Sequence, residues 1–372
     1  MDALTTPLPK AWQKVRLGDI FFITAGGDLS KPHYSNTKQS DFNYPIYSNA
    51  IEKKGLYGYS SFFIIKNKSI TITSRGTIGV AFFRDYPYVP IGRLLVLQPK
   101  ISNIDCRFYA EYINSKVKFN TEQTTIPQLT IPKVALCEIL LPPLNEQIAI
   151  ANILSDVDRY LYSLDALILK KESVKKALSF ELLSQRKRLK GFNQAWQRVR
   201  LGDICEIVKG QQINKISLNN TDKYPVINGG IDFLGYTNKF NVSKNTIAIS
   251  EGGTCGYVRF MSSDFWSGGH NYSLQKISNK VNNLCLYHIL KSYEKDIMKL
   301  GVGSGLKNIQ LKALKDFEIL LPPLNEQIAI ANILSDLDNE IISLKNKKRQ
   351  FDNIKKALNH DLMSAKIRVL KK

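Results

Sequence analysis

The sequence predicts an α+β protein in which two globular α/β heads are held apart by two long antiparallel coiled-coil helices, with approximate two-fold symmetry. Three observations support this prediction. The segment Glu138–Asp156 recurs without change as Glu318–Asp336, and the opening Ala11–Ile20 recurs as Ala195–Ile204 with one substitution. After each long repeat, apolar residues continue at the spacing of a coiled coil. The chain order is therefore head, helix, head, helix.

The first head shows the pattern of short strands. Runs rich in β-branched and aromatic residues, bounded by glycine and proline, predict strands. These runs are Ser69–Thr73, Val80–Phe83, Leu94–Leu97 and Glu138–Leu141. The apolar spacing of Asp105–Lys118 predicts a helix. The strands are expected to form a curved or barrel-like sheet. The Pro142-Pro143 pair ends the last strand, because proline cannot donate a hydrogen bond to a sheet.

Each long helix begins at the leucine that follows the proline pair, at Leu144 and at Leu324. Apolar residues then alternate in steps of four and three, which is the spacing of the a and d positions of a coiled coil. Each helix is expected to run about 40 residues, or about 60 Å. The predicted seam consists of Leu154, Val157, Leu161, Leu164, Leu178, Leu334, Leu337, Ile341, Leu344 and Leu358.

The path of the chain predicts the helix orientation. The first helix delivers the chain to the second head through Lys190–Gln194, so the second helix must return toward the first head to pack along it. The two helices are therefore expected to be antiparallel, with the heads at opposite ends. The expected segments are 1–141 for the first head, 142–190 for the first helix, 191–321 for the second head and 322–372 for the second helix.

The second head repeats the scheme of the first with different residues. TSRGTIGV at Thr73–Val80 matches ISEGGTCGYV at Ile249–Val258 in outline, which places Arg75-Gly76 opposite Glu251-Gly252. Two different heads on one frame predict two different targets. Two identical helix surfaces predict two copies of the same partner.

The composition favours a polyanionic partner. The 372 residues carry a formal net charge of +20, and nucleic acid is the leading partner for so basic a chain, although a merely basic protein is the plain alternative. The five cysteines are odd in number and contain no CxxC pair, which disfavours a disulfide framework or a zinc site and fits a reducing cytoplasm. The start MDALTTPLPKAW lacks the apolar core of a secretion signal, and no run approaches the roughly 20 apolar residues of a membrane span.

The duplicated LPPLNEQIAIANILSD segments, the two WQxVRLGDI openings, the order of heads and helices and the basic charge together resemble the DNA-specificity (S) subunit of type I restriction–modification systems. The resemblance covers nearly the whole chain. It implies that the heads are target recognition domains, each reading one half of a split double-stranded DNA site. It also implies that the helices set the spacer between the halves and bind two methyltransferase (modification) subunits.

The resemblance further implies that this chain has no catalytic site of its own. The assembled complex would be an adenine-N6 DNA methyltransferase and an ATP-dependent endonuclease, with restriction/translocase subunits joining for cleavage. S-adenosylmethionine, ATP and Mg are then expected in the partner subunits and not in this chain.

Candidate DNA contacts are basic and amide side chains near turns and aromatic residues. Arginine reads guanine, asparagine and glutamine read adenine, and lysines neutralise phosphates, whereas a solvated surface charge is the alternative for each single residue. The candidates are Lys66, Lys68, Arg75, Arg84, Arg93, Gln128, Thr130, Lys209, Gln211, Gln212, Lys215, Asn228, His270, Asn271, Ser304, Lys307 and Asn308.

The LPPLNEQ motif has two interpretations. Glu146 and Glu326 fit a helix start, where a carboxylate lies near the positive end of the helix dipole, and the resemblance adds a nearby docking surface for the methyltransferase. Two other functions stay open: a coiled-coil interaction protein that reads no bases, and a self-contained DNA enzyme. A nuclease built on Asp41, Glu52 and Lys54 is disfavoured because the second head has Asp232-Phe233-Leu234 at the matching place, with no lysine, and the four histidines are scattered.

Overall fold

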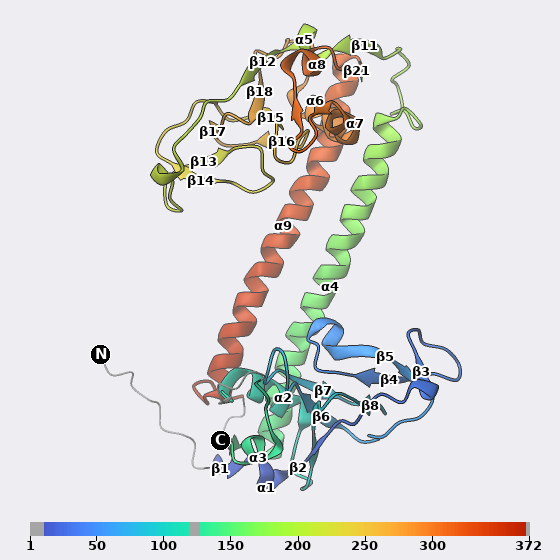
Figure 1. Ribbon diagram of the computed structural model, residues 1–372, viewed down its shortest axis with the longest axis vertical. Helices are drawn as coiled ribbons and strands as arrows, with labels where there is room; N and C mark the ends of the chain where they lie inside the picture. Colours follow the sequence, from blue (N-terminus) through green and yellow to red (C-terminus); the bar gives the residue numbers. More distant parts are fainter. Residues whose placement is uncertain (1–10, 120–126, 370–372) are drawn as a thin grey trace. The chain divides into compact units, whose positions relative to one another are not determined.

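The computed structural model describes residues 11–119 and 127–369, which form two compact units. The first unit combines the residues up to Leu164 with those from Lys347 onward, and the second unit is Asp165–Asn346. Each unit therefore contains one head and a segment of each long helix. Figure 1 labels most of the helices and strands of both units.

The first head contains two four-stranded sheets and a pair made by its first and last strands. One sheet is antiparallel with the order β2-β9-β6-β7, and the other has the order β3-β5-β4-β8, in which β8 runs parallel to β4. The strands are β1 (Gln13–Arg16), β2 (Phe21–Ala25), β3 (Tyr34–Ser35), β4 (Tyr44–Tyr47), β5 (Leu56–Ser60), β6 (Ser69–Ile72), β7 (Ala81–Arg84), β8 (Val89–Pro90), β9 (Leu95–Pro99) and β10 (Glu138–Leu141). The helices are α1 (Leu17–Ile20), α2 (Cys106–Lys116) and α3 (Ile131–Ala135), with 3-10 turns η1 (Lys31–His33) and η2 (Glu52–Gly55).

The second head repeats this order. Its sheets are β12-β18-β15-β16, β14-β13-β17 with β17 parallel to β13, and the pairs β11-β21 and β19-β20. The strands are β11 (Gln197–Arg200), β12 (Glu206–Lys209), β13 (Tyr224–Ile227), β14 (Gly235–Thr237), β15 (Thr246–Ser250), β16 (Val258–Met261), β17 (Trp266–Ser267), β18 (Asn271–Gln275), β19 (Gly301–Val302), β20 (Asn308–Ile309) and β21 (Glu318–Leu321). The helices are α5 (Leu201–Ile204), α6 (Asn283–Ser292), α7 (Glu294–Lys299) and α8 (Leu311–Lys315), with the 3-10 turn η3 (Lys215–Ser217).

The predicted strands and the predicted head helix are confirmed to within two residues at most ends, as β6, β7, β9, β10 and α2. The expectation of one curved or barrel-like sheet is wrong. The described strands of both heads are only two to five residues long, and they pair in several small sheets instead of closing one large one.

The first and last strands of each head pair in the same register. Gln13 faces Leu141 in the first head, and Gln197 faces Leu321 in the second. The last strand leads through the proline pair directly into the long helix, so the start of each long helix is fixed to the sequence that opens its head.

The long helices are α4 (Leu144–Leu183) and α9 (Leu324–Met363), each of 40 residues as predicted. They pack antiparallel in both units. In the first unit Lys355 binds Asp158 at 2.7 Å, and the ring centroids of Tyr160 and Phe351 lie 4.6 Å apart. From Asp158 to Tyr160 the chain advances along α4, while the partner on α9 moves back from Lys355 to Phe351, so the two helices run in opposite directions. In the second unit Lys171 binds Glu340 and Lys175 binds Asp338 in the same sense.

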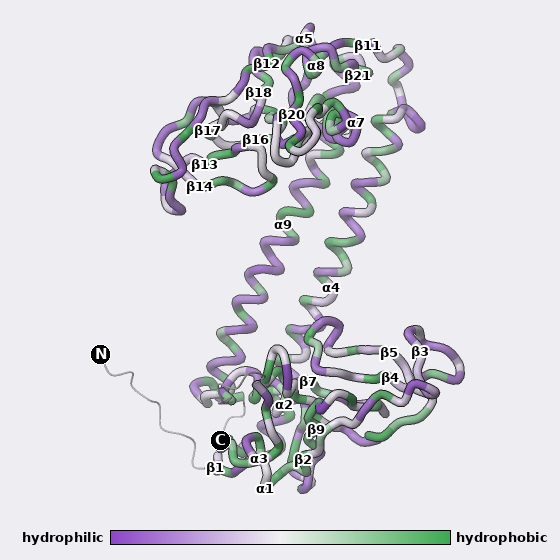
Figure 2. The backbone as a smooth tube through the Cα atoms, in the orientation of Figure 1, coloured by the Kyte–Doolittle hydropathy of each residue, from purple (hydrophilic) through white to green (hydrophobic). Residues whose placement is uncertain are grey.

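The predicted seam is buried or half-buried along both helices. Among its members, Leu154, Leu161, Leu164, Leu334 and Ile341 are buried, and Val157, Leu178, Leu337, Leu344 and Leu358 are half-buried. Figure 2 shows the corresponding alternation of hydrophobic and hydrophilic residues along α4 and α9.

The core of each unit is shared between head and helices. In the first unit Leu17 and Ile139 of the head join Leu154 of α4 and Leu362 of α9 in one buried cluster. In the second unit the equivalent cluster includes Leu334 and Leu183 together with head residues. The removal of this apolar surface from water therefore holds each head to its helix segments.

Candidate nucleic-acid interface

Both heads carry a turn of the same geometry after a central strand, β6 in the first head and β15 in the second. The turns are Thr73–Val80 and Ser250–Tyr257, and in each the first residue is hydrogen-bonded to the last two at 2.8 and 3.0 Å. The fourth residue of each turn is a glycine in the left-handed conformation, with φ of 66° at Gly76 and 68° at Gly253. Glycine adopts this conformation without the steric cost that a side chain brings.

The matching turns fix which residues of the two heads correspond. Arg75 corresponds to Gly252, and Ser74 corresponds to Glu251. The sequence alignment of Arg75 with Glu251 is therefore wrong by one residue. The two aligned sequence ranges differ in length, so the alignment can shift by a residue. Hydrogen bonds determine where each strand ends and its turn begins, and the amino-acid sequence does not show them.

A second segment meets this turn in the first head. The amide of Leu129 donates to the carbonyl of Ser74 at 2.9 Å, which brings Gln128 beside Arg75. The Arg75 guanidinium donates to Gln128 Oε1 from Nη2 at 3.0 Å and from Nε at 3.3 Å. Two predicted DNA contacts that are 53 residues apart in the chain are thus joined at one place.

The second head repeats this meeting of segments. The amide of Ile309 donates to the carbonyl of Glu251 at 2.9 Å, so Asn308 lies beside Gly252. A methyl group added to Gly252 would collide with Asn308 Oδ1. The amide side chains of Gln128 and Asn308 therefore occupy equivalent positions, although only the first has an arginine to bind.

A third segment, which follows the parallel strand β8 or β17, completes the site. Ser74 Oγ donates to the carbonyl of Arg93 at 2.6 Å, and the amide of Glu251 donates to the carbonyl of His270 at 2.8 Å. The sequence predicts Arg93 and His270 separately as DNA contacts, and the structure shows that they occupy equivalent positions. Each head thus gathers three loops at one end of its central strand.

The side chains at the two sites differ in charge. In the second head, the Glu251 carboxylate binds Lys209 Nζ at 2.7 Å, accepts from the Tyr272 hydroxyl at 3.3 Å and lies 4.0 Å from His270 Nδ1. Burial, with the neighbouring Glu251 charge, raises the pKa of Tyr272 to about 12, so the hydroxyl keeps its proton and remains a donor. In the first head, the position of Glu251 is taken by Ser74, which carries no charge. Arg75 and Arg93 of this head are both exposed.

Asn49 in the first head is not predicted from the sequence. Its Oδ1 accepts from the Ser74 amide at 2.7 Å, and its Nδ2 donates to the carbonyl of Gly92 at 2.6 Å, so it joins the loops that carry Arg75 and Arg93. The pairing of Glu251 with Lys209 is not predicted from the sequence either. No local pattern signals either residue, because their partners come from distant loops.

Other predicted residues of the second head lie around its site. Asn228 Oδ1 accepts from the His270 amide at 3.0 Å, and the side chain of Gln212 lies against Gly269. The carbonyl of Gln211 accepts from Trp266 Nε1 at 2.9 Å. The remaining members are exposed on neighbouring turns: Lys215 in η3, and Ser304 and Lys307 between β19 and β20.

Two predicted lysines of the first head lie away from this site. Lys66 and Lys68 are exposed but precede β6, whereas the turn with Arg75 follows it, so a strand of about 13 Å separates them. Thr130 is exposed and directly precedes α3, two residues after Gln128 in the chain.

Two predicted DNA contacts are wrong. Arg84 is only 1% exposed; its Nε donates to Thr71 Oγ1 at 3.1 Å, its Nη2 donates to the carbonyl of Lys54 at 2.6 Å, and its guanidinium stacks 3.6 Å from the centre of the Tyr47 ring. Asn271 is 2% exposed beneath its loop. A side chain with its polar atoms enclosed cannot reach a phosphate or a base edge, and alternation with aromatic residues in the sequence does not distinguish a buried arginine from an exposed one.

The LPPLNEQ motif proves to be internal. Glu146 is 2% exposed and lies in the first turn of α4 as predicted. Its carboxylate accepts from Trp12 Nε1 at 2.9 Å and from Arg368 Nε at 2.7 Å. In the second unit Glu326 accepts from Trp196 Nε1 at 3.0 Å and from both Nε and Nη2 of Arg188 at 2.8 Å. We call each set of three side chains a clamp.

Each clamp joins three parts of its unit: the opening of the head, the start of one long helix and the residues that follow the other. The neighbouring Gln147 and Gln327 are also buried, and each accepts from the backbone amide that begins the head helix, at 2.9 and 2.7 Å. The duplicated motif thus has the same structural role in both units, and its buried carboxylates are not available to a partner.

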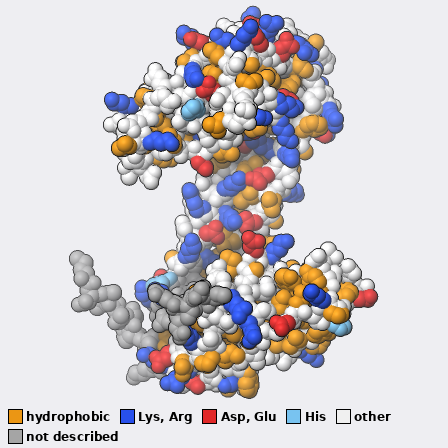
Figure 3. All heavy atoms as spheres, in the orientation of Figure 1, with side chains coloured by type: hydrophobic (Ala, Val, Ile, Leu, Met, Phe, Trp, Pro, Cys, Tyr) orange, Lys and Arg blue, Asp and Glu red, His pale blue; other side chains and the backbone are white. Residues whose placement is uncertain are grey.

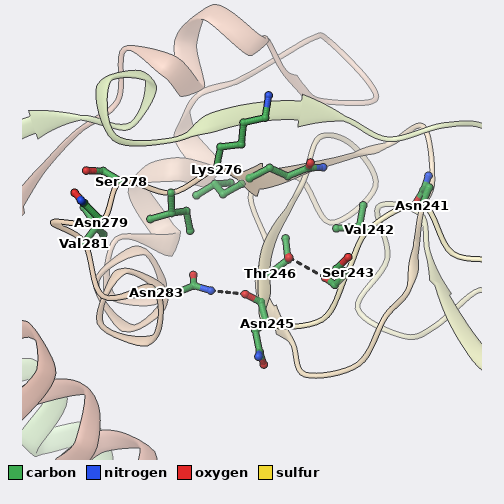
Figure 4. A pocket seen from close by; sticks show the side chains of 13 residues that line it. Asn241, Val242, Ser243, Asn245, Thr246, Lys276, Ser278, Asn279, Val281 and Asn283 are labelled. Atoms are coloured by element: carbon green, nitrogen blue, oxygen red, sulfur yellow. Dashed lines mark hydrogen bonds between the residues drawn. The ribbon is translucent and has the colours of Figure 1, made fainter.

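The second head also contains a polar cavity of about 500 Å³ at the other end of β15. Figure 4 shows that Asn283 points to the backbone of Asn245 and that Thr246 binds Ser243 within its wall. The cavity does not adjoin the three-loop site. Within residues 11–119 and 127–369, no group of three His, Cys, Asp or Glu side chains is arranged to hold a metal ion.

The face of the molecule in Figure 3 shows basic and acidic side chains interspersed along the helices. The basic excess is therefore not a single continuous stripe on that face. In the described part of the chain, no helix combines the length and the hydropathy required to cross a membrane.

Comparison with known proteins agrees with this architecture. The family described as "Type I restriction modification DNA specificity domain" matches residues 9–171 and 193–351. The specificity subunit of a type I restriction enzyme from Methanocaldococcus jannaschii is 25% identical over 407 residues, covering 97% of this chain and 94% of that protein. A Mycoplasma pneumoniae protein named as a type I specificity subunit is 38% identical over 165 residues, 42% of this chain, and the match spans only 44% of that relative's length.

The same fold occurs in a solved structure. The crystal structure of the S subunit of a type I restriction–modification system from M. genitalium has a TM-score of 0.74 and 21% sequence identity, covering 96% of this chain and 98% of that one. A structure described as addressing complex assembly and conformational transition of the type I system has a TM-score of 0.52 and 16% identity. With the family matched over both heads and most of both helices, the chain belongs to the type I restriction–modification DNA specificity subunits.

Proposed function

We propose that each head reads one half of a bipartite, asymmetric DNA site. The observation that carries this proposal is the three-loop site, which has the same backbone in both heads but different side chains. Equivalent backbones would approach two half-sites in the same manner, and different side chains would read different bases. The chain is a specificity subunit and not itself the enzyme.

The side chains suggest the chemistry of each half. In the first head, Arg75 would read a guanine and the adjacent Gln128 an adenine. In the second head, Asn308 takes the position of Gln128, and a glycine in place of Arg75 leaves the space beside the turn to the Asn308 side chain, which would read an adenine there. Lys209, Lys215 and Lys307 would contact phosphates around it.

We propose that the helices set the spacer and dock two methyltransferase subunits. Both helices are continuous for 40 residues, about 60 Å, and about 34 Å separates half-sites one DNA turn apart. In this proposal the functional segments are 1–141, 142–190, 191–321 and 322–372. Partner subunits would supply S-adenosylmethionine, ATP and Mg for adenine-N6 methylation and for ATP-dependent cleavage with restriction/translocase subunits.

Binding to DNA in the presence of the methyltransferase subunits should fall steeply with salt. Neutralising about eight phosphates predicts a slope of about −7 for the logarithm of the binding constant against the logarithm of salt concentration. Fluorescence anisotropy with a pool of duplexes measures the slope, and one split sequence should bind more tightly than the rest. Equal binding of every sequence would favour the coiled-coil interaction protein, and methylation or cleavage by the chain alone would favour the self-contained enzyme.

Replacing Arg75 with alanine should relax the preference at one base pair of one half-site. Loss of a bidentate contact costs about 1–3 kcal/mol of discrimination, and the other half-site should be read as before. Competition binding with single-base variants of the site measures this. Lys66→Ala is the control: it should weaken all sequences alike, if at all. A uniform loss of affinity in Arg75→Ala, with unchanged discrimination, would remove Arg75 from base reading.

A further inference from the structure

A groove of about 670 Å³ runs between α4, α6 and α9 within the second unit. Its walls combine basic and apolar side chains. Five lysines and two acidic residues line it, together with the exposed Phe180 and Ile342, which are 55% and 56% exposed. An opening that is both basic and apolar suits a ligand with carboxylates and a hydrophobic face.

The two acidic residues are already paired inside the groove. Lys345 binds Glu172 at 2.6 Å, and Lys175 binds Asp338. Lys176 and Lys295 are exposed, and they make no ion pair within residues 11–119 and 127–369. The groove therefore holds an excess of positive charge.

His288 of α6 lines the groove and is 4% exposed, and its Nε2 has no hydrogen-bond partner among the described residues. Burial, helped by the Lys175 charge, lowers the pKa of His288 to about 4, although Asp338 opposes the shift. The ring is therefore neutral at pH 7. A buried polar atom without a partner is rare and calls for an explanation.

The first unit shows what occupies the equivalent place there. Asp105 and Asn282 both begin the head helix and donate their amides to the buried glutamine of the LPPLNEQ motif, at 2.9 and 2.7 Å. Glu111 and His288 each lie six residues after these equivalent helix starts, so Glu111 in the first unit corresponds to His288 in the second. The sequence KKAL likewise makes Lys355 the counterpart of Lys175.

In the first unit a carboxylate of the protein itself lies at this place. Glu111 accepts from Asn359 Nδ2 at 3.0 Å and lies 3.8 Å from Lys355 Nζ, which also binds Asp158. The second unit keeps the lysine and the aspartate but has His288 in place of the glutamate. It therefore lacks an internal carboxylate at the point where the first unit has one.

We infer that the groove of the second unit receives a carboxylate from an acidic, amphipathic segment of the methyltransferase subunit, which lies beside the groove lysines as Glu111 lies beside Lys355 in the first unit. This inference rests on the proposed docking function. The partner's carboxylate lies near Lys175 and Lys176, and its apolar residues cover Phe180 and Ile342. The two docking sites are thus unequal, because only the second contributes this contact.

The test compares matched variants of the two KKAL segments, using the full chain and the purified methyltransferase subunit. Lys176→Glu changes the groove of the second unit, and Lys356→Glu makes the same change at the equivalent position of the first. Native mass spectrometry gives the number of subunits bound, and titration gives each affinity. Lys176→Glu should weaken one of two binding events about tenfold or more, the usual size of a lost charge-assisted hydrogen bond, and Lys356→Glu should weaken neither.

A third variant, His288→Glu, supplies the missing carboxylate from within and should weaken the same binding event. Circular dichroism shows whether this variant folds. If it does not fold, the comparison of Lys176→Glu with Lys356→Glu still tests the inference. If wild-type chain binds no subunit, the proposed docking function fails and the inference fails with it. If wild type binds two subunits and Lys176→Glu binds them as tightly, only the inference fails. If Lys176→Glu instead weakens binding of duplex DNA alone, the groove takes phosphates and the inference is overturned.

Discussion

Glu326→Gln should lower the free energy of unfolding of the chain by about 3 kcal/mol, and Glu146→Gln by a similar amount. Each substitution keeps the shape of the side chain but removes the charge that holds a half-buried arginine and an indole N–H. Glu326 is 1% exposed and its Arg188 partner 27% exposed, so solvent cannot replace the lost interaction fully. Urea denaturation followed by tryptophan fluorescence measures the change, since Trp12 and Trp196 both belong to the clamps.

Glu318→Gln is the matched control for the clamp. Glu318 binds Arg198 at 3.1 Å, but the two side chains are 43% and 71% exposed. An exposed ion pair of this kind contributes little, so the control should change stability by less than about 1 kcal/mol. If Glu326→Gln were as mild as Glu318→Gln, the clamp would be a surface interaction and the duplicated motif would need another explanation.

The repeat and the heptad spacing were sufficient to predict the architecture of the helices. Both helices begin at the predicted leucine, and their packing direction follows from the path of the chain. Periodicity is a local property of the sequence, which is why it can be read directly. The clamp is not local: Arg188 and Arg368 lie more than 100 residues from the glutamates they bind. They fall in stretches that, in the sequence alone, resemble linkers.

The candidate site was predicted as a set of residue types and not as a geometry. Arg75, Gln128, Arg93, His270 and Asn308 are predicted from their residue types and their places near turns and aromatic residues, and the structure brings them to the three-loop sites. Arg84 was selected on the same grounds and is buried, because an arginine can satisfy its donors on backbone carbonyls and aromatic faces inside a head.

Leu334→Asp should have the largest effect on stability of the variants considered, a loss of more than about 4 kcal/mol, and Leu154→Asp should match it. The two leucines are 0% and 1% exposed, and each lies in the cluster that joins helix and head. An aspartate there loses the apolar contacts and buries a carboxylate with no partner. Assembly with the methyltransferase subunits should be lost together with the fold, and unchanged complex formation would count against the seam.

The pH dependence of the variant distinguishes a buried charge from a simple cavity. A carboxylate in an apolar core has its pKa raised above that of the unfolded chain, about 3.9, so the folded state binds the proton more tightly. The deficit of Leu334→Asp relative to wild type should therefore be smallest below about pH 4 and should grow as the pH rises through the raised pKa. Leu334→Ala leaves a cavity without a charge, and its deficit should not vary with pH. Ile342→Asp, on the same helix but 56% exposed, should show neither the large loss nor the pH dependence.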